Sequence, residues 1–286
     1  MKFSLILATV GKSEIMISLL ESLKCQSVQS FELIVVDQNR DNRLIPILNS
    51  YQDSYEIKHI PSELGLSKAR NIGIQVAEGD VFAFPDDDCW YRERILEQIS
   101  NKFTSRPEVG GLCGRAVDEN GVNIARYARH PGLVTKLNAW ERCSSISLFL
   151  RNRAIRTVGC FDEQLGLGAR TPWQSAEDID LPIRLVTTGF QLRYDPEIVV
   201  YHPASLKDGA PQSCKRAYGY GVGVGFIWRK HNFPKWLVSY YLTRPLAGYI
   251  VSMAMLQPGK SRYYWSSFKG RWEGWRSVDG YPTNNS

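Results

Sequence analysis

Three consecutive carboxylates, Asp86, Asp87 and Asp88, come directly after the apolar run at residues 81–84 and a proline. A short apolar run bounded by Pro and Asp is typical of a buried strand, so we expect the acids at the rim of a sheet. Three like charges this close repel one another, and a cation would compensate them. Carboxylate oxygens are hard ligands that suit Mg²⁺ or Mn²⁺ rather than zinc. A solvated turn, in which one Asp caps a helix that begins near Arg92, is the alternative interpretation.

The elements around these acids indicate what else lies near them. Residues 3–8 and 31–36 read as buried strands that end at Thr9 and Asp37, and a helix is predicted between them. A third strand and a further helix precede the run that carries the acids, which predicts an α/β fold with right-handed crossovers. The carboxyl ends of such strands share one edge, so Thr9, Asp37 and the three acids should converge on one crevice. This convergence favours the metal interpretation over the capping one.

A second pair of acids, Glu177 and Asp178, follows a glycine-rich loop that contains Gly168 and Trp173. We expect this loop, with Gly168, Trp173 and the adjoining Glu177, to form a flap that closes over a substrate. A carboxylate at the edge of the flap is a candidate general base. Because Ser175 and Asp178 also have the spacing of a capping box, Asp178 alternatively closes only a helix start.

Residues 189–194 and 197–203 are two short strand-like runs, and His202 lies near the end of the second. A lone histidine is usually structural, but one at a strand end near acids would complete a metal or diphosphate site. The turn after the first strand has neither a dinucleotide fingerprint nor a P-loop. A nucleotide would therefore be held by side chains and metal.

The composition bounds the function classes. The chain has 286 residues, a net charge of +6 and a sequence pI near 8.9, which favours anionic partners such as nucleotide phosphates or anionic lipid. No nucleic-acid-reading motif accompanies the charge, so we expect no nucleic-acid partner. Six cysteines without a C-x-x-C pair suggest neither a zinc site nor a disulfide framework, and reduced thiols fit the cytoplasm.

The last part of the chain differs in composition. Its apolar stretch, residues 236–256, is interrupted by Arg244 and Pro245. The longest uncharged part is shorter than the roughly twenty residues that a transmembrane helix needs. Aromatic residues interleave here with Lys and Arg, which fits contact with a membrane interface. A helical lid packed on the catalytic domain is the alternative.

Five motifs, taken together, give the sequence a family resemblance. With these motifs in this order, the sequence resembles the family 2 glycosyltransferases. That family has the GT-A fold, which is a Rossmann-like, mostly parallel sheet flanked by helices. The match covers roughly the first two hundred residues, the length of one domain. It rests on residues 4–10, residues 31–37, residues 65–73, the triplet as the DxD motif, and the pair at residues 177–178.

The resemblance implies an activity. It implies metal-dependent, inverting transfer from a nucleotide diphosphate sugar, with a UDP-sugar favoured, to a hydroxyl of a saccharide or lipid-linked saccharide. Cell-surface polysaccharide synthesis is the expected setting, at the cytoplasmic face of a membrane. A nucleotidyltransferase on a related fold would need a glycine-rich phosphate loop after the first strand, and residues 9–12 are too short for one. A non-catalytic sugar-nucleotide-binding or membrane scaffold protein remains the other alternative.

The resemblance also implies residue roles. Nucleotide-binding side chains are expected at Thr9, Asp37, Arg70, Asp86 and Asp87. Metal ligands are expected at Asp88 as the principal ligand, Asp86 and His202, and the catalytic base at Asp178. Many members carry a second acid after the one matching Asp37, but this chain has Gln38, which leaves the base identity open because an amide both donates and accepts hydrogen bonds.

The domain prediction follows from these assignments. We expect a glycosyltransferase domain at residues 1–205, with a nucleotide-sugar half at about 1–115 and an acceptor half at about 116–205. A helical, possibly membrane-associating region should follow at residues 206–286. The oligomeric state does not follow from the sequence.

Overall fold

The computed structural model describes residues 1–11, 13–204 and 209–277. The chain forms two compact units. One comprises residues 1–169 and 177–205, and the other comprises residues 170–176 and 206–286. The boundary expected between residues 205 and 206 lies outside the described residues.

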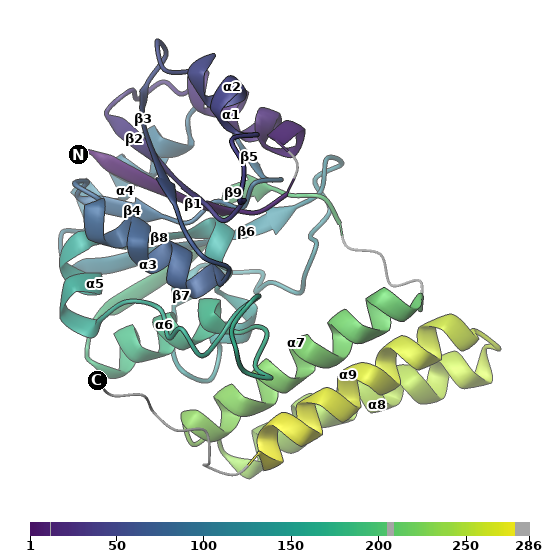
Figure 1. The fold of residues 1–286 in the computed structure, drawn as a ribbon. Helices are drawn as coiled ribbons and strands as arrows, with labels where there is room; N and C mark the ends of the chain where they lie inside the picture. The colour runs from purple at the N-terminus through teal and green to yellow at the C-terminus, as the bar shows by residue number, and fades with distance from the viewer. Residues whose placement is uncertain (12, 205–208, 278–286) are drawn as a thin grey trace. The chain divides into compact units, whose positions relative to one another are not determined.

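One sheet organises the first unit (Figure 1). Over the described residues it has nine strands, in the order β3-β2-β1-β4-β8-β6-β9-β5, with β7 paired to β9. The first half is parallel and consists of β3 (Glu56–Pro61), β2 (Phe31–Asp37), β1 (Phe3–Thr9) and β4 (Val81–Ala83). The second half consists of β8 (Leu148–Arg151), β6 (Val109–Val117), β9 (Gln191–Tyr201), β5 (Trp90–Tyr91) and β7 (Gly132–Leu133).

Helices cover both faces of this sheet (Figure 1). Alternate side chains of β1, Phe3, Leu5 and Leu7, belong to one core cluster with apolar side chains of α1, α2 and α4. The opposite face packs against α3, which contacts β1 and β2 and buries Ala69 and Ile74. The helices of this unit are α1 (Ile17–Lys24), α2 (Ile45–Asn49), α3 (Leu66–Val76), α4 (Ile95–Ser105), α5 (Asn152–Val158) and α6 (Glu177–Thr187). The expected α/β fold is confirmed.

One predicted break in the sheet is absent. The runs at residues 189–194 and 197–203 were expected to be two strands, but β9 continues from Gln191 to Tyr201. The ladder between β6 and β9 instead changes register between Cys113 and Arg115. Pro196 lies opposite this irregularity, where a residue without a backbone N–H can be accommodated in a strand.

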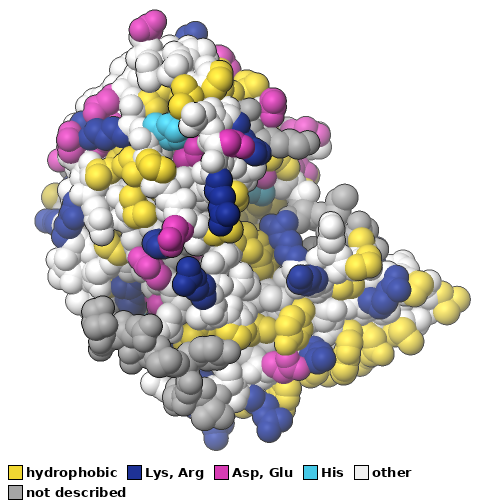
Figure 2. All heavy atoms as spheres, in the orientation of Figure 1, with side chains coloured by type: hydrophobic (Ala, Val, Ile, Leu, Met, Phe, Trp, Pro, Cys, Tyr) yellow, Lys and Arg dark blue, Asp and Glu magenta, His cyan; other side chains and the backbone are white. Residues whose placement is uncertain are grey.

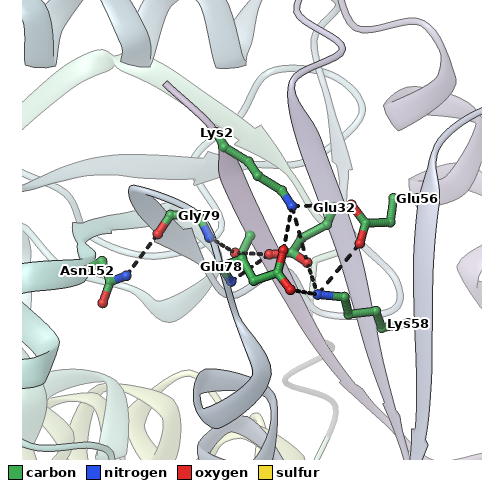
Figure 3. Close-up of polar contacts among 8 residues, drawn as sticks. Lys2, Glu32, Glu56, Lys58, Glu78, Gly79 and Asn152 are labelled. Carbon is green, nitrogen blue, oxygen red and sulfur yellow. Dashed lines mark hydrogen bonds and ion pairs between the residues drawn. The ribbon is translucent and has the colours of Figure 1, made fainter.

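The amino-terminal ends of the parallel strands carry a cluster of ion pairs (Figure 3). Glu32 of β2 is fully buried, and its Oε2 lies 2.7 Å from Nζ of Lys58 and 3.8 Å from Nζ of Lys2. Glu78 and Glu56 lie around the same two ammonium groups. Two cations therefore compensate three acids at the edge of the sheet opposite to the strand ends that carry Thr9 and Asp37.

The second unit is helical. Its helices are α7 (Pro211–Lys230), α8 (Lys235–Ala254) and α9 (Pro258–Arg276), and α9 packs against both of the others. A Cβ on Gly274 would overlap the carbonyl of Val222, so α7 and α9 approach closely at this glycine. The predicted C-terminal helical region is confirmed. Within the described residues, none of the helices combines the length and apolarity needed to cross a bilayer.

Candidate active site

The acidic triplet follows the carboxyl end of β4, beside the end of β1. Asp87 and Thr9 are joined directly, because the Thr9 hydroxyl donates to Oδ2 of Asp87 over 2.6 Å. Burial raises the pKa of Asp87, and the bond from Thr9 opposes this rise. Two of the strand ends that were expected to converge are therefore connected by a hydrogen bond.

Asp86, Asp88 and His202 form a group whose potential ligand atoms all lie within 4.8 Å of one another. The pairing of β5 with β9 produces this arrangement, because the antiparallel register sets Trp90 opposite Tyr201. Asp88 precedes β5 and His202 follows β9, so the two side chains meet with Nε2 of His202 3.0 Å from Oδ1 of Asp88. Burial lowers the pKa of His202, but the Asp88 carboxylate raises it further, and the net direction is upward.

Asp37 ends β2 and is held by two neighbours. Its Oδ1 accepts hydrogen bonds from the backbone and side-chain nitrogens of Asn39, over 2.9 and 2.8 Å, and its Oδ2 lies 2.9 Å from Nε2 of His59. His59 was not among the predicted site residues. It pairs with Val35 in the parallel register, and Asp37 pairs with Pro61, so the two-residue period of strands already sets His59 on the side of Asp37.

Gln38, the departure from the family pattern, has both ends of its amide engaged. Its Oε1 accepts from the backbone N–H of Gly65 over 2.7 Å, and its Nε2 donates to the Thr9 carbonyl over 3.4 Å. The side chain is buried. Gln38 therefore joins the ends of β1 and β2 to the start of α3.

Arg70 of α3 is 1% exposed and connects the two groups of acids. One terminal nitrogen donates to Oδ1 of Asp86 and the other to Oε1 of Glu177, both over 3.1 Å. The guanidinium also lies 5.3 Å from the ring centre of Phe161, and its buried Nε has no hydrogen-bond partner among the described residues. Arg70 thus bridges residues more than ninety positions apart in the sequence, Asp86 and Glu177.

Glu177 and Asp178 begin α6. Burial, together with the adjacent Asp178 carboxylate, raises the pKa of Glu177 to about 7, and Arg70 opposes this rise. Burial also raises the pKa of Asp178, while Arg70 and the backbone N–H of Ser145 favour its charged form. At neutral pH the pair accordingly holds more protons than two exposed carboxyl groups would.

The expected flap is divided between the two units. Gly168, with φ near +78°, lies against Gly65 at the start of α3, and a Cβ there would approach the Gly65 nitrogen to 3.1 Å. Trp173 belongs to the second unit, where its ring stacks on Phe226 with the ring centres 3.7 Å apart. Trp173 is buried in this arrangement. The rings bury each other's apolar faces, which a loop tip in water could not do.

The alternative role of Asp178, in a capping box with Ser175, is not supported by the hydrogen bonds of Ser175. The hydroxyl of Ser175 donates to the Tyr220 carbonyl over 2.9 Å, within the second unit. The bond that a capping box assigns to this hydroxyl therefore goes elsewhere. Glu177, rather than Ser175, is the first residue of α6.

Two carboxylates and one imidazole nitrogen form a donor set that fits Mn²⁺, and Mg²⁺ less well, since imidazole is a softer ligand than an oxygen. A second acidic group, Glu32, Glu56 and Glu78, also has converging oxygens. The ammonium groups of Lys2 and Lys58 already pair with these three acids (Figure 3). Of the two acidic groups found among the described residues, the group of Asp86, Asp88 and His202 is therefore the better candidate for a metal site.

A model of the family described as "Glycosyl transferase family 2" matches residues 4–160, more than half of the 286-residue chain. The chain is 32% identical over 192 residues to a pre-mycofactocin glycosyltransferase of Mycobacterium tuberculosis (strain CDC 1551 / Oshkosh), a match over 62% of this chain and 38% of that protein. It thus spans well under half the length of that relative. It is also 22% identical over 304 residues to the O-antigen chain rhamnosyltransferase RfbN of Salmonella typhimurium (strain LT2), a match over 95% of this chain and 96% of that protein.

Solved structures share the fold. The mannosyltransferase PcManGT from Pyrobaculum calidifontis, in complex with GDP-Man and Mn²⁺, gives a TM-score of 0.66 at 14% identity and covers 96% of this chain and 86% of its own. S. aureus TarS 1-349 in complex with UDP-GlcNAc gives 0.61 at 16% identity, over 96% of this chain and 91% of its own. The family model covers more than half of the chain and the solved structures share its fold, so the chain belongs to glycosyltransferase family 2.

Proposed function

We propose that this chain is a glycosyltransferase that moves a sugar from a nucleotide diphosphate sugar, a UDP-sugar first, to a hydroxyl of a saccharide or lipid-linked saccharide in polysaccharide synthesis. The observation that carries the proposal is the bridge of Arg70 between Asp86 and Glu177. It connects the acids suited to a donor diphosphate with the acids suited to an acceptor hydroxyl. Transfer needs both at one reacting carbon.

The donor is held in this proposal at the carboxyl ends of β1, β2 and β4. Asp37, whose carboxylate is oriented by Asn39 and His59, faces the nucleotide base, with Thr9 beside it. Asp86 and Asp87 lie toward the ribose and diphosphate. The donor half then corresponds to residues up to about 115, and the acceptor half to the rest of the first unit.

Asp88, Asp86 and His202 would hold the divalent ion. When bound, such an ion stabilises the charge of the departing diphosphate as a Lewis acid. His202 must be neutral at Nε2 to bind a cation, and its Nδ1 lies 2.7 Å from the carbonyl of Pro203, which favours a proton on Nδ1. Arg70 contributes a fixed positive charge beside Asp86.

Asp178 acts as the general base. It takes the proton of the acceptor hydroxyl while the acceptor oxygen forms its bond to the anomeric carbon. The bond between that carbon and the diphosphate oxygen breaks in the same displacement, which inverts the anomeric centre. Arg70 and the N–H of Ser145 keep Asp178 able to ionise despite its burial.

The nucleotide and sugar are tested together. The purified chain would be screened for thermal stabilisation by UDP, GDP and their sugars, with and without Mn²⁺, because a specific ligand stabilises the folded state by mass action. We expect stabilisation by a UDP-sugar that requires Mn²⁺, followed by release of UDP when acceptor saccharide is added. Stabilisation by GDP-sugars alone would mean that the donor is a GDP-sugar and not a UDP-sugar. Stabilisation with no release of nucleotide, by either hydrolysis or transfer, would support a non-catalytic binding protein.

A further inference from the structure

The outer side of α8 exposes apolar side chains along its length. Trp236 is 67% exposed and is followed at helical spacing by Tyr240, Ile250 and Val251, all exposed. Thr243 and Ala247, on the same side, are exposed and uncharged, and the exposed Arg244 borders them beside Tyr240 and Val251. The turn after the helix adds Leu256, 88% exposed. Residues at this spacing form one continuous stripe on a helix.

The neighbouring helix α9 presents a different pattern. Trp265 and Trp272 are exposed seven positions apart, and Arg262, Lys269 and Arg276 are exposed at the positions between and beside them. The guanidinium of Arg276 lies over the Trp272 ring, 5.5 Å from its centre. The Trp265 ring contacts Tyr249 of α8, with 5.3 Å between ring centres. Figure 2 shows hydrophobic side chains with Lys and Arg among them where Figure 1 draws these helices.

The positive charge of the chain is concentrated in this unit. Residues 211–276 contain eleven Lys and Arg and one acid, Glu273, which gives +10, whereas the whole chain carries +6. The remainder of the chain is therefore net negative. Between residues 235 and 272 there is no acidic residue.

We propose that the outer surfaces of α8 and α9 dock on a lipid bilayer that contains anionic lipid, with the stripe of α8 and Leu256 entering the interface. Aliphatic side chains enter the acyl boundary, Trp rings lie at the headgroups, and Lys and Arg bind lipid phosphates. An anionic polymer would bind the cations but leave Ile250, Val251 and Leu256 in water. A second copy would bring two basic units together, each with a charge of +10 over residues 211–276, and these units repel each other.

Docking is measured by co-sedimentation of the full chain with vesicles, without donor or acceptor. We expect binding to phosphatidylcholine vesicles that contain phosphatidylglycerol, weaker binding to phosphatidylcholine alone, and a decrease with added salt. The double variant Ile250→Asp/Leu256→Asp should bind at least about tenfold more weakly. Its matched control is Val122→Asp/Leu133→Asp, two exposed apolar residues of the first unit, which should bind as the unchanged chain does.

A second set of variants separates the charges from the apolar stripe. Arg262→Gln/Lys269→Gln/Arg276→Gln should lose about fivefold per cation, and Lys24→Gln/Arg94→Gln/Arg106→Gln in the first unit should lose little. Failure of the unchanged chain to sediment with anionic vesicles overturns the proposal. So does binding that survives the two Asp substitutions, or a dimer in light scattering that they dissociate. Sedimentation is independent of turnover, so a failed transfer assay with intact docking would overturn the proposed function alone.

Discussion

At the scale of single residues, the proposed site contains two adjacent carboxyl groups in different surroundings. Asp178 accepts a hydrogen bond from the backbone N–H of Ser145 and is attracted by the positive charge of Arg70. Glu177 accepts a hydrogen bond from Arg70 itself. Both have raised pKa values because burial disfavours their charged forms. Glu177 neutralises part of the Arg70 charge, and we assign it to positioning and Asp178 to proton transfer.

Asp178→Asn should abolish transfer and preserve donor binding. The amide keeps the size of the side chain but cannot accept the proton of the acceptor hydroxyl, so the turnover number should fall by about 10²- to 10⁴-fold. Transfer rates and calorimetric binding of a nucleotide diphosphate with Mn²⁺ would be compared. Turnover within a few fold of the unchanged enzyme would remove Asp178 from this role.

Glu177→Gln should shift the pH profile of transfer. With Asp178 as the proposed base, the rate should rise as Asp178 loses its proton, and charge on Glu177, whose pKa is raised to about 7, opposes that loss. An uncharged Gln removes the repulsion, so the acid limb of kcat/KM should move to lower pH. Glu119→Gln, an exposed acid in a distant turn, is the control and should leave the profile in place. A limb that stays in place, or moves upward, contradicts the coupling.

At the scale of elements, the sequence predicted the strand ends better than the contacts among them. The apolar runs before Thr9, Asp37 and Asp86 are long enough to identify buried parallel strands, and these strands form as expected. The two-residue strand β5 has no periodicity to detect, yet its register with β9 is what brings His202 to Asp88. The position of Trp173 also depends on a partner fifty-three residues away, Phe226.

Asp88→Ala should weaken the binding of a nucleotide diphosphate in the presence of Mn²⁺. Removing one of two carboxylates from the group with His202 should lower metal affinity at least about tenfold. Titration calorimetry with Mn²⁺ and with EDTA would measure it, and Asp53→Ala, an exposed acid outside the site, is the control. If EDTA and the Asp88 substitution leave nucleotide affinity unchanged, the site needs no metal at these residues.

The ion-pair cluster on the opposite edge predicts a pH-dependent stability (Figure 3). Burial opposes ionisation of Glu32. Hydrogen bonds from the side chains of Lys58 and Ser4 and from the backbone N–H of Glu78 nevertheless lower its pKa below the ordinary 4.5. Its ionised form therefore stabilises the fold above pH 4.5, and this stability is lost as the pH falls through the lowered folded value. Lys58→Met should reduce the free energy of unfolding by about 1–3 kcal/mol at pH 7.

Urea unfolding at pH 7 and at pH 3 would check this difference. The loss caused by Lys58→Met should shrink at the lower pH, because Glu32 is then increasingly protonated in both proteins. Lys24→Met, an exposed lysine at the end of α1, should have little effect at either pH. A loss that is equal at both pH values would mean that Lys58 stabilises the sheet by packing rather than by charge.

At the scale of the whole molecule, the chain is organised so that residues 170–176 leave the first unit and return to it at Glu177. The sequence predicted a helical C-terminal region. It contains no local pattern that would assign residues 170–176 to the same unit as these later helices. Trp173 is held by Phe226 of α7, and the hydroxyl of Ser175 by the carbonyl of Tyr220. The residues just before Glu177 and Asp178 are thus ordered by the helical unit.

Phe226→Ala tests whether this ordering matters for transfer. Loss of the ring leaves Trp173 without its stacking partner, at a cost of about 1–3 kcal/mol, so residues 170–176 should loosen. The KM for acceptor should rise and kcat should fall, whereas donor affinity, which depends on β1, β2 and β4, should not change. Phe268→Ala removes a ring of α9 that stacks on Trp265 and serves as the matched control, with transfer kept. Equal effects of both substitutions on kcat and on donor affinity would show general destabilisation and refute a specific link between the helical unit and the acceptor step.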